Sequence, residues 1–70
     1  MAKNVEDMTR LELAEEVELI AMHGAFGERA RKVVAMHNQR NAEFDARVEH
    51  YLSRGEDHHT AYTWAAEEVR

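Results

Sequence analysis

Hydrophobic residues recur at helical spacing along most of the chain and divide it into three segments. In the first segment, Leu13, Val17 and Ile20 follow a 4-3 spacing that stops at Gly24. The second segment keeps this spacing over three heptads in a different phase, and its members are Ala30, Val34, His37, Asn41, Phe44, Val48 and Tyr51. The apolar positions of the third segment are Ala61, Tyr62, Trp64, Ala65 and Val69. These spacings match the 3.6-residue turn of an α-helix, so the pattern predicts three helices.

Residues typical of helix ends flank each segment. Thr9 and Glu12 form a capping box, in which each side chain accepts a hydrogen bond from the backbone N–H of the other residue. Gly24 can adopt the left-handed conformation that ends a helix, and Gly55 can do the same after the second segment. Asp57 is suited to cap the third segment. These signals predict helices over about residues 10–23, 28–53 and 58–69.

The length and composition of the chain limit its fold class. Its 70 residues are enough for one domain, which we place at residues 1–70. A hydrophobic content of 44% is too high for a disordered acidic tail, and a chain with no proline and three glycines lacks the turn residues of β-sandwiches and barrels. We therefore predict an all-α, short-long-short chain: a helical hairpin followed by a C-terminal helix, packed as a dimeric helical bundle.

The first predicted helix has two apolar faces, although a surface helix of a monomer needs only one. One face carries Leu13, Ala14, Val17, Ile20 and Ala21. The other face carries Met8, Leu11, Leu19 and Met22. Because a domain of this size buries little apolar surface by itself, the second face favours a homodimer with two-fold symmetry. The alternative is that the N-terminal arm or the third helix covers this face within one chain.

Two polar residues interrupt the stripe of the second helix. His37 and Asn41 occupy core positions of its heptads, and a buried asparagine can fix the register and dimeric state of paired helices. Ordinary packing within one chain, with both residues at the edge of a groove, explains the same pattern. The predicted dimer interface comprises Met8, Leu11, Leu19, Met22, His37 and Asn41.

Residues that usually carry catalysis or bind metals are scarce or unfavourably spaced. The chain has no cysteine, one serine (Ser53) and five histidines, none of them at the spacing of helical metal ligands. It also lacks a glycine-rich phosphate loop and a nucleophile-elbow motif. We therefore expect no enzyme activity, no catalytic residue, no metal and no cofactor. Without an apolar run suited to a signal peptide or a membrane span, we expect a cytoplasmic protein with no membrane partner.

Charge is unevenly distributed along this acidic chain. The net charge is −5, yet residues 29–54 carry six basic and three acidic side chains. Arginine, tyrosine and tryptophan dominate the energetics of protein interfaces, so we expect an adaptor or inhibitor that binds a regulatory protein or an enzyme and modulates its activity. An accessory protein of a phage-type mobile element is one example. The candidate partner-binding residues are Phe26, Arg29, Arg31, Arg40, Arg47, Tyr62 and Trp64.

Nucleic-acid binding is the rival functional class. Three helices match the size of a helix-turn-helix DNA-binding regulator. Residue types that read base edges occur on the second helix, at Asn38, Gln39, Arg40 and Asn41. However, an isoelectric point of about 5.4 is far below the value typical of DNA-binding domains. A further hypothesis is that the carboxylates of the first helix imitate the phosphates of a nucleic acid. We rank both hypotheses below protein binding.

Overall fold

Three α-helices and one short 3-10 helix make up the computed structural model, which describes residues 3–24 and 26–70. They are η1 (Val5–Asp7), α1 (Arg10–His23), α2 (Glu28–Ser53) and α3 (His58–Glu68). The described residues contain no strand. The predicted all-α class and the short-long-short order are therefore confirmed, and the helix bounds agree with the predicted ones to within one residue.

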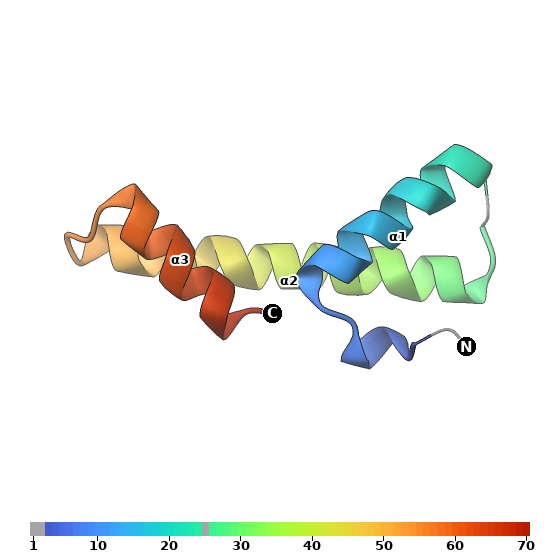
Figure 1. Ribbon diagram of the computed structural model, residues 1–70, viewed down its shortest axis with the longest axis horizontal. Helices are drawn as coiled ribbons and strands as arrows, with labels where there is room; N and C mark the ends of the chain where they lie inside the picture. The colour runs from blue at the N-terminus through green and yellow to red at the C-terminus, as the bar shows by residue number, and fades with distance from the viewer. Residues whose placement is uncertain (1–2, 25) are drawn as a thin grey trace.

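The long helix α2 forms the axis of the molecule (Figure 1). Helix α1 folds back along the first half of α2, and α3 folds back along its second half. Both short helices therefore run antiparallel to α2. The resulting shape is elongated, with extents of 43 × 20 × 15 Å. Its radius of gyration is 14.0 Å, whereas a compact chain of this length has about 11 Å.

Hydrogen bonds at the ends of α1 involve the residues that predicted those ends. The Thr9 hydroxyl accepts from the Glu12 amide at 3.2 Å, and the Glu12 carboxylate accepts from the Thr9 amide at 2.9 Å. The Thr9 N–H and the Lys3 ammonium hold the pKa of Glu12 below its usual value. Gly24 ends α1 with a φ of 65°, a conformation that is strained for residues with a side chain.

The start of α3 is fixed in the same way. The Asp57 carboxylate accepts from the Thr60 amide at 2.7 Å, and this hydrogen bond lowers the pKa of Asp57. Gly55, just after α2, has a φ of 94° and turns the chain back. The predicted cap and turn glycine are both confirmed, so the lengths of the helices follow from local sequence signals.

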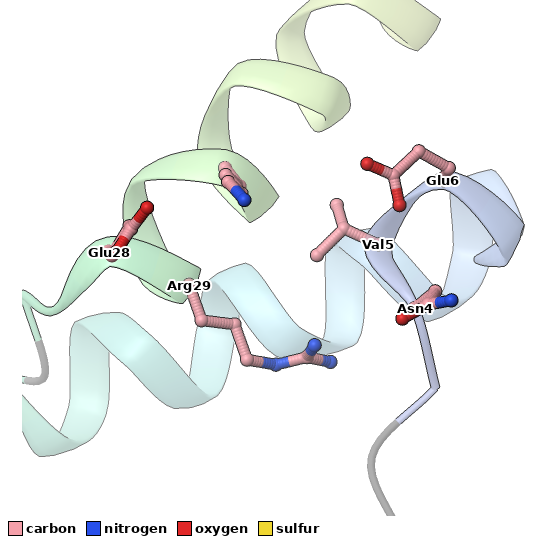
Figure 2. Close-up of a pocket in the computed structure, with 6 residues that line it drawn as sticks. Asn4, Val5, Glu6, Glu28 and Arg29 are labelled. Carbon is pink, nitrogen blue, oxygen red and sulfur yellow. The ribbon is translucent and has the colours of Figure 1, made fainter.

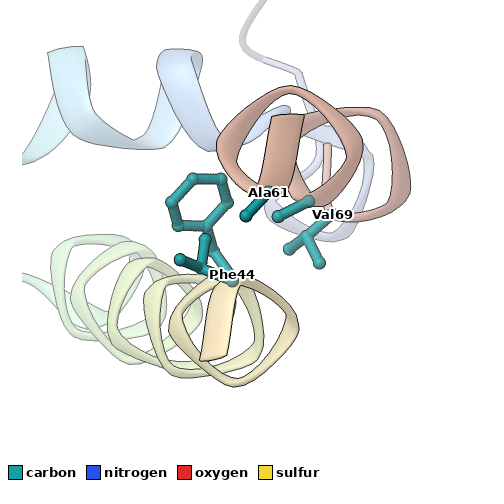
Figure 3. Packing of buried hydrophobic residues seen from close by; sticks show 5 residues of the cluster. Phe44, Ala61 and Val69 are labelled. Atoms are coloured by element: carbon teal, nitrogen blue, oxygen red, sulfur yellow. The ribbon is translucent and has the colours of Figure 1, made fainter. Parts of the chain in front are cut away.

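The hydrophobic core consists of two separate clusters, one for each half of α2. The first cluster joins η1, α1 and α2 and contains Val5, Met8, Leu13 and Val33. The second cluster joins α2 to the end of the chain and contains Phe44, Val48, Ala61, Ala65 and Val69. Figure 3 shows Phe44 reaching from α2 toward Ala61 of α3, beside Val69. Because α3 presents alanines at this contact, it lies close to α2.

Arg10 connects the two halves at the middle of the molecule. Its guanidinium lies over the ring of Phe44, 3.7 Å from the ring centroid, in a cation–π contact. Its backbone N–H donates to the carbonyl of Arg70. The start of α1 is thereby joined both to α2 and to the chain that follows α3.

One predicted core position is wrong. The heptad pattern places Val34 in the buried seam of α2, but Val34 is 37% exposed, whereas Val33 is fully buried. The reason is the contribution of the N-terminal segment, since Val5 of η1 and Met8, which follows η1, belong to the same buried cluster as Val33. They bury Val33 together with Leu13. Val34 is therefore left at the uncovered side of the α1–α2 hairpin.

Candidate functional site

One side of the α1–α2 hairpin is covered by η1 and its flanking residues. The Arg40 guanidinium donates to the backbone carbonyls of Met8 at 3.2 Å and Glu6 at 3.3 Å, which ties η1 to α2. Figure 2 shows the hollow that remains here, a space of about 310 Å³ lined by Asn4, Val5, Glu6, Glu28, Arg29 and Lys32. Arg29 donates to Glu16 of α1 at 2.9 Å. On this side, Arg29 and Arg40 are therefore engaged within the chain.

The opposite side of the hairpin is open and largely apolar. A groove of about 490 Å³ lies between α1 and α2, and its lining consists of Ile20, Phe26, Ala30, Arg31, Val34, Ala35 and Asn38. Phe26 lies at the end of the hairpin and is 79% exposed. Arg31 and Asn38 are the polar members of the lining. We call this surface the hairpin groove.

A smaller hollow lies between α1 and α2 nearer the middle of the molecule. This hollow of about 150 Å³ is lined by Arg10, Leu11, Ala14, His37 and Asn41. The amide nitrogen of Asn41 lies 3.1 Å from His37 Nε2. The other ring nitrogen, His37 Nδ1, is buried with no hydrogen-bond partner among the described residues. Both residues thus lie at the edge of a groove, as one of the two interpretations of the sequence expects.

A further surface lies where α3 meets the end of α2. The Trp64 ring packs edge-on against Tyr51, with centroids 5.2 Å apart, and Trp64 remains 41% exposed. These two residues share a hollow of about 360 Å³ with Arg54 and Glu56. We use the term Trp64 surface for the group formed by Arg47, Tyr51, Arg54, Trp64 and Glu68.

Polar contacts hold the Trp64 surface in place. The Tyr51 hydroxyl donates to the Glu68 carboxylate, and this hydrogen bond raises the pKa of Tyr51. The Arg47 guanidinium pairs with the other oxygen of Glu68 at 3.5 Å. Tyr51 is therefore fixed by Glu68 and by the Trp64 ring. Side chains that are already ordered lose less conformational entropy when a partner binds.

The four arginines predicted to bind a partner do not form one strip. Arg29 pairs with Glu16, and Arg40 is bound to backbone carbonyls of the N-terminal segment. Arg31 lines the hairpin groove, and Arg47 belongs to the Trp64 surface. Arg29, Arg40 and Arg47 are 11 and 7 residues apart and therefore share one face of α2, whereas Arg31 lies on the opposite side. Arg40 is also one of the predicted base-reading residues, and its guanidinium is engaged within the chain.

The three aromatic residues predicted to bind a partner also lie apart. Phe26 is at the end of the hairpin, and Trp64 belongs to the Trp64 surface. Tyr62 lies on the other flank of α3, where its ring is 5.7 Å from Phe44 and stacks with His58 at 6.4 Å. The aromatic residues of α2 and α3 thus form two pairs, Phe44 with Tyr62 and Tyr51 with Trp64.

The predicted dimer face of α1 is partly covered within the chain itself. Met8 belongs to the core and is only 4% exposed, because η1 folds over it, so its assignment to a dimer interface is wrong. Leu11 and Leu19 line two different hollows. Leu11, Leu19 and Met22 are all more than half exposed, so their assignment to a dimer interface stays a prediction.

We also searched the chain for metal-binding groups, membrane-spanning helices and known relatives. Among residues 3–24 and 26–70, no three histidine, aspartate or glutamate side chains are grouped to hold a metal ion. No helix in the described part of the chain is both long and apolar enough to cross a membrane. Comparison with known protein families, curated proteins and solved structures finds no match to this chain.

Sequence reasoning missed the residues that complete the two open surfaces. Ile20, Ala30 and Ala35 line the hairpin groove, but they were assigned to the core or given no role. The small apolar residues beside the predicted seam of α2 are the signal that could have revealed this groove. Tyr51 and Arg54 complete the Trp64 surface. Arg54 gives no sequence signal, because it lines the same hollow as Trp64 only when α3 folds back.

Proposed function

We propose that this chain is a non-enzymatic, dimeric protein-interaction module that binds another protein, either a regulator or an enzyme, and modulates its activity. The Trp64 surface is the proposed binding site for that protein. The observation that carries the proposal is the half-exposed ring of Trp64, held edge-on by Tyr51 beside an open hollow. Tryptophan, tyrosine and arginine are the residues most enriched among energetic hot spots of protein interfaces.

The geometry of the Trp64 surface supports a protein ligand in particular. Arg54 lines the hollow next to Trp64, and no ion pair engages it among the described residues. A fitting partner presents an apolar side chain to the Trp64 ring and a carboxylate or carbonyl to the Arg54 guanidinium. Such a combination of an apolar contact and a polar rim is typical of protein interfaces.

The non-enzymatic part of the proposal rests on the sequence. The chain has no cysteine and a single serine, Ser53, which lies at the end of α2 and donates its hydroxyl to the His50 carbonyl at 2.7 Å. The open surfaces are lined by alanines, aliphatic residues and aromatic rings together with the polar residues Arg31, Asn38, Arg54 and Glu56. These groups favour the burial of a partner's side chains over chemical reaction.

Affinity capture with matched variants tests the proposed function. The tagged chain is incubated with nuclease-treated lysate of its source or host, and the retained protein is purified and titrated against the chain by calorimetry. Trp64→Ala is expected to weaken binding by at least about 2 kcal/mol. Tyr62→Ala removes an aromatic ring from the other flank of α3 and is expected to leave binding nearly unchanged.

The outcomes separate protein binding from the rival class. A stoichiometric protein that Trp64→Ala loses and Tyr62→Ala retains would support the proposal. Equal binding by the wild-type chain and Trp64→Ala would reject the Trp64 surface. Recovery of nucleic acid alone, and only without nuclease, would instead support a DNA-binding regulator, whose affinity falls steeply with salt.

A further inference from the structure

We propose that the hairpin groove binds the same groove of a second copy of this chain, so that two α1–α2 hairpins pack into a four-helix bundle. The inference rests on the dimeric state in the proposed function and assigns its interface. This interface is an alternative to the predicted outer face of α1, from which Met8 is removed by its burial in the core. The Trp64 surface lies toward the other end of α2 and stays free in such a dimer (Figure 1).

The chain exposes more surface than a compact monomer of its mass. Its accessible surface is 5211 Å², whereas a compact monomer of 8.1 kDa exposes about 4,500 Å². The excess of about 700 Å² is close to the roughly 800 Å² that each partner buries in a standard protein interface. The chain therefore carries enough additional surface for one interface of ordinary size.

The lining of the hairpin groove suits a neighbouring helix. Ile20 and Val34 provide aliphatic walls, and Ala30 and Ala35 leave room for a helix to approach closely. Phe26 projects from the end of the hairpin with 79% of its surface exposed. In a pair of hairpins related by a two-fold axis, each Phe26 is available to cover apolar surface of the other copy.

The charges of the two helices favour one arrangement of the hairpins. Glu18 of α1 forms no ion pair with any described residue, and neither does Arg31, which lines the groove. When α1 of one copy lies beside α2 of the other, the Glu18 carboxylate of one copy can approach the Arg31 guanidinium of the other. Exposed ion pairs add little affinity, but they select the orientation of the partners.

Sedimentation equilibrium from about 1 to about 200 µM tests this interface. The wild-type chain is expected to approach twice its mass of 8.1 kDa at the highest concentrations. Val34→Glu places an unpaired carboxylate in the groove and is expected to raise the dissociation constant of the dimer at least about tenfold. Ala46→Glu makes the same change in charge at an exposed position of α2 outside the groove, so it should dimerise like the wild type.

Circular dichroism of the same samples separates dissociation from unfolding. Val34→Glu should keep the helical spectrum, because Val34 lies outside both buried clusters. If it unfolds, Phe26→Ser, which lies outside the helices, makes the same test. The proposal is overturned by a single-chain mass of the wild type at every concentration. It is equally overturned if the folded groove variant dimerises like the wild type, or if Ala46→Glu dissociates as much as that variant.

Failure of the interface and failure of the proposed function are distinguishable. The Trp64→Ala variant is expected to dimerise but to lose the partner protein, whereas the Val34→Glu monomer keeps an intact Trp64 surface. A normal dimer that binds no protein would reject the Trp64 surface alone. A monomeric wild type that still binds a protein through Trp64 would reject the groove interface alone.

Discussion

The two halves of the molecule use the long helix α2 in different ways. In the α2–α3 half, Ala61 and Ala65 let the helices pack closely, and two aromatic pairs cover both flanks of α3. In the α1–α2 half, the larger side chains of Leu13 and Val33 fill the contact. Here η1 covers one side of the hairpin, and the hairpin groove remains open on the other.

This difference shows that a packed pair of helices needs side chains that cover both flanks of its contact. Both halves have well-capped helices and a buried seam, but only the α2–α3 pair is flanked on both sides by side chains of the same chain. The α1–α2 pair lacks one flank. A pair of this kind gains stability when another element covers the exposed groove, because more apolar surface is then removed from water.

Removing a core side chain of the α1–α2 half should have the largest effect. Leu13→Ala deletes a fully buried side chain and is expected to lower the free energy of unfolding by about 2–5 kcal/mol. Leu11→Ala makes the same substitution at an exposed position of α1 and should cost no more than about 0.5 kcal/mol. Urea unfolding of dilute protein measures both, and equal losses would contradict the described packing of α1.

Enlarging an alanine of the α2–α3 half should have the next largest effect. Ala65→Leu inserts a larger side chain into a fully buried position between α2 and α3. We expect it to lower the free energy of unfolding by about 1–3 kcal/mol. Ala66→Leu is the control, since Ala66 is exposed on the same helix. If both variants unfold at the same urea concentration as the wild type, α3 does not pack closely through its alanines.

Removing the cap of α1 should cost less. Thr9→Ala deletes the hydroxyl that accepts from the Glu12 amide, so it is expected to lower the free energy of unfolding by about 1 kcal/mol. The pKa of Glu12 should rise toward its usual value if the capping box is disrupted, as a titration followed by NMR can measure. Thr63→Ala is the control, because the Thr63 hydroxyl bonds a carbonyl within α3 and caps no helix. A free energy of unfolding equal to that of the wild type would argue against the capping box.

The smallest expected effect is a change in the acid sensitivity of α3. The Thr60 amide lowers the pKa of Asp57, so the charged carboxylate stabilises the folded state above the unfolded pKa, and this stabilisation is lost as the pH falls through the lowered folded pKa. Asp57→Asn keeps an acceptor for the cap but does not titrate. Between about pH 6 and about pH 3 its stability should therefore fall less than that of the wild type. Asp45→Asn, which caps no helix, is the control, and an equal pH response in all three chains would contradict this role.

The ends of the helices could be predicted from the sequence because they depend on neighbouring residues. Thr9, Gly24 and Asp57 act through hydrogen bonds and backbone conformations within a few residues of themselves. The phase of the core in α2 was harder to predict. Val33 is buried because η1 packs on it from a distant part of the sequence, and the heptad pattern contains no information about that contact.

The candidate surfaces could be predicted only in part. Exposed aromatic residues such as Phe26 and Trp64 stand out in the composition and pattern of the sequence. Their neighbours do not, because Trp64 and Arg54 line one hollow only through the fold of α3 over α2. The intramolecular role of Arg40 was missed for the same reason, since its acceptors are the backbone carbonyls of the N-terminal segment.

Amide hydrogen exchange at two protein concentrations tests most directly whether the α1–α2 half is completed by a second copy. Dimerisation stabilises the elements that it covers by mass action. On raising the concentration, exchange should slow in α1 and in residues 28–41, whereas α3 should show little change. Exchange that is independent of concentration, or that slows first in α3, would contradict the account.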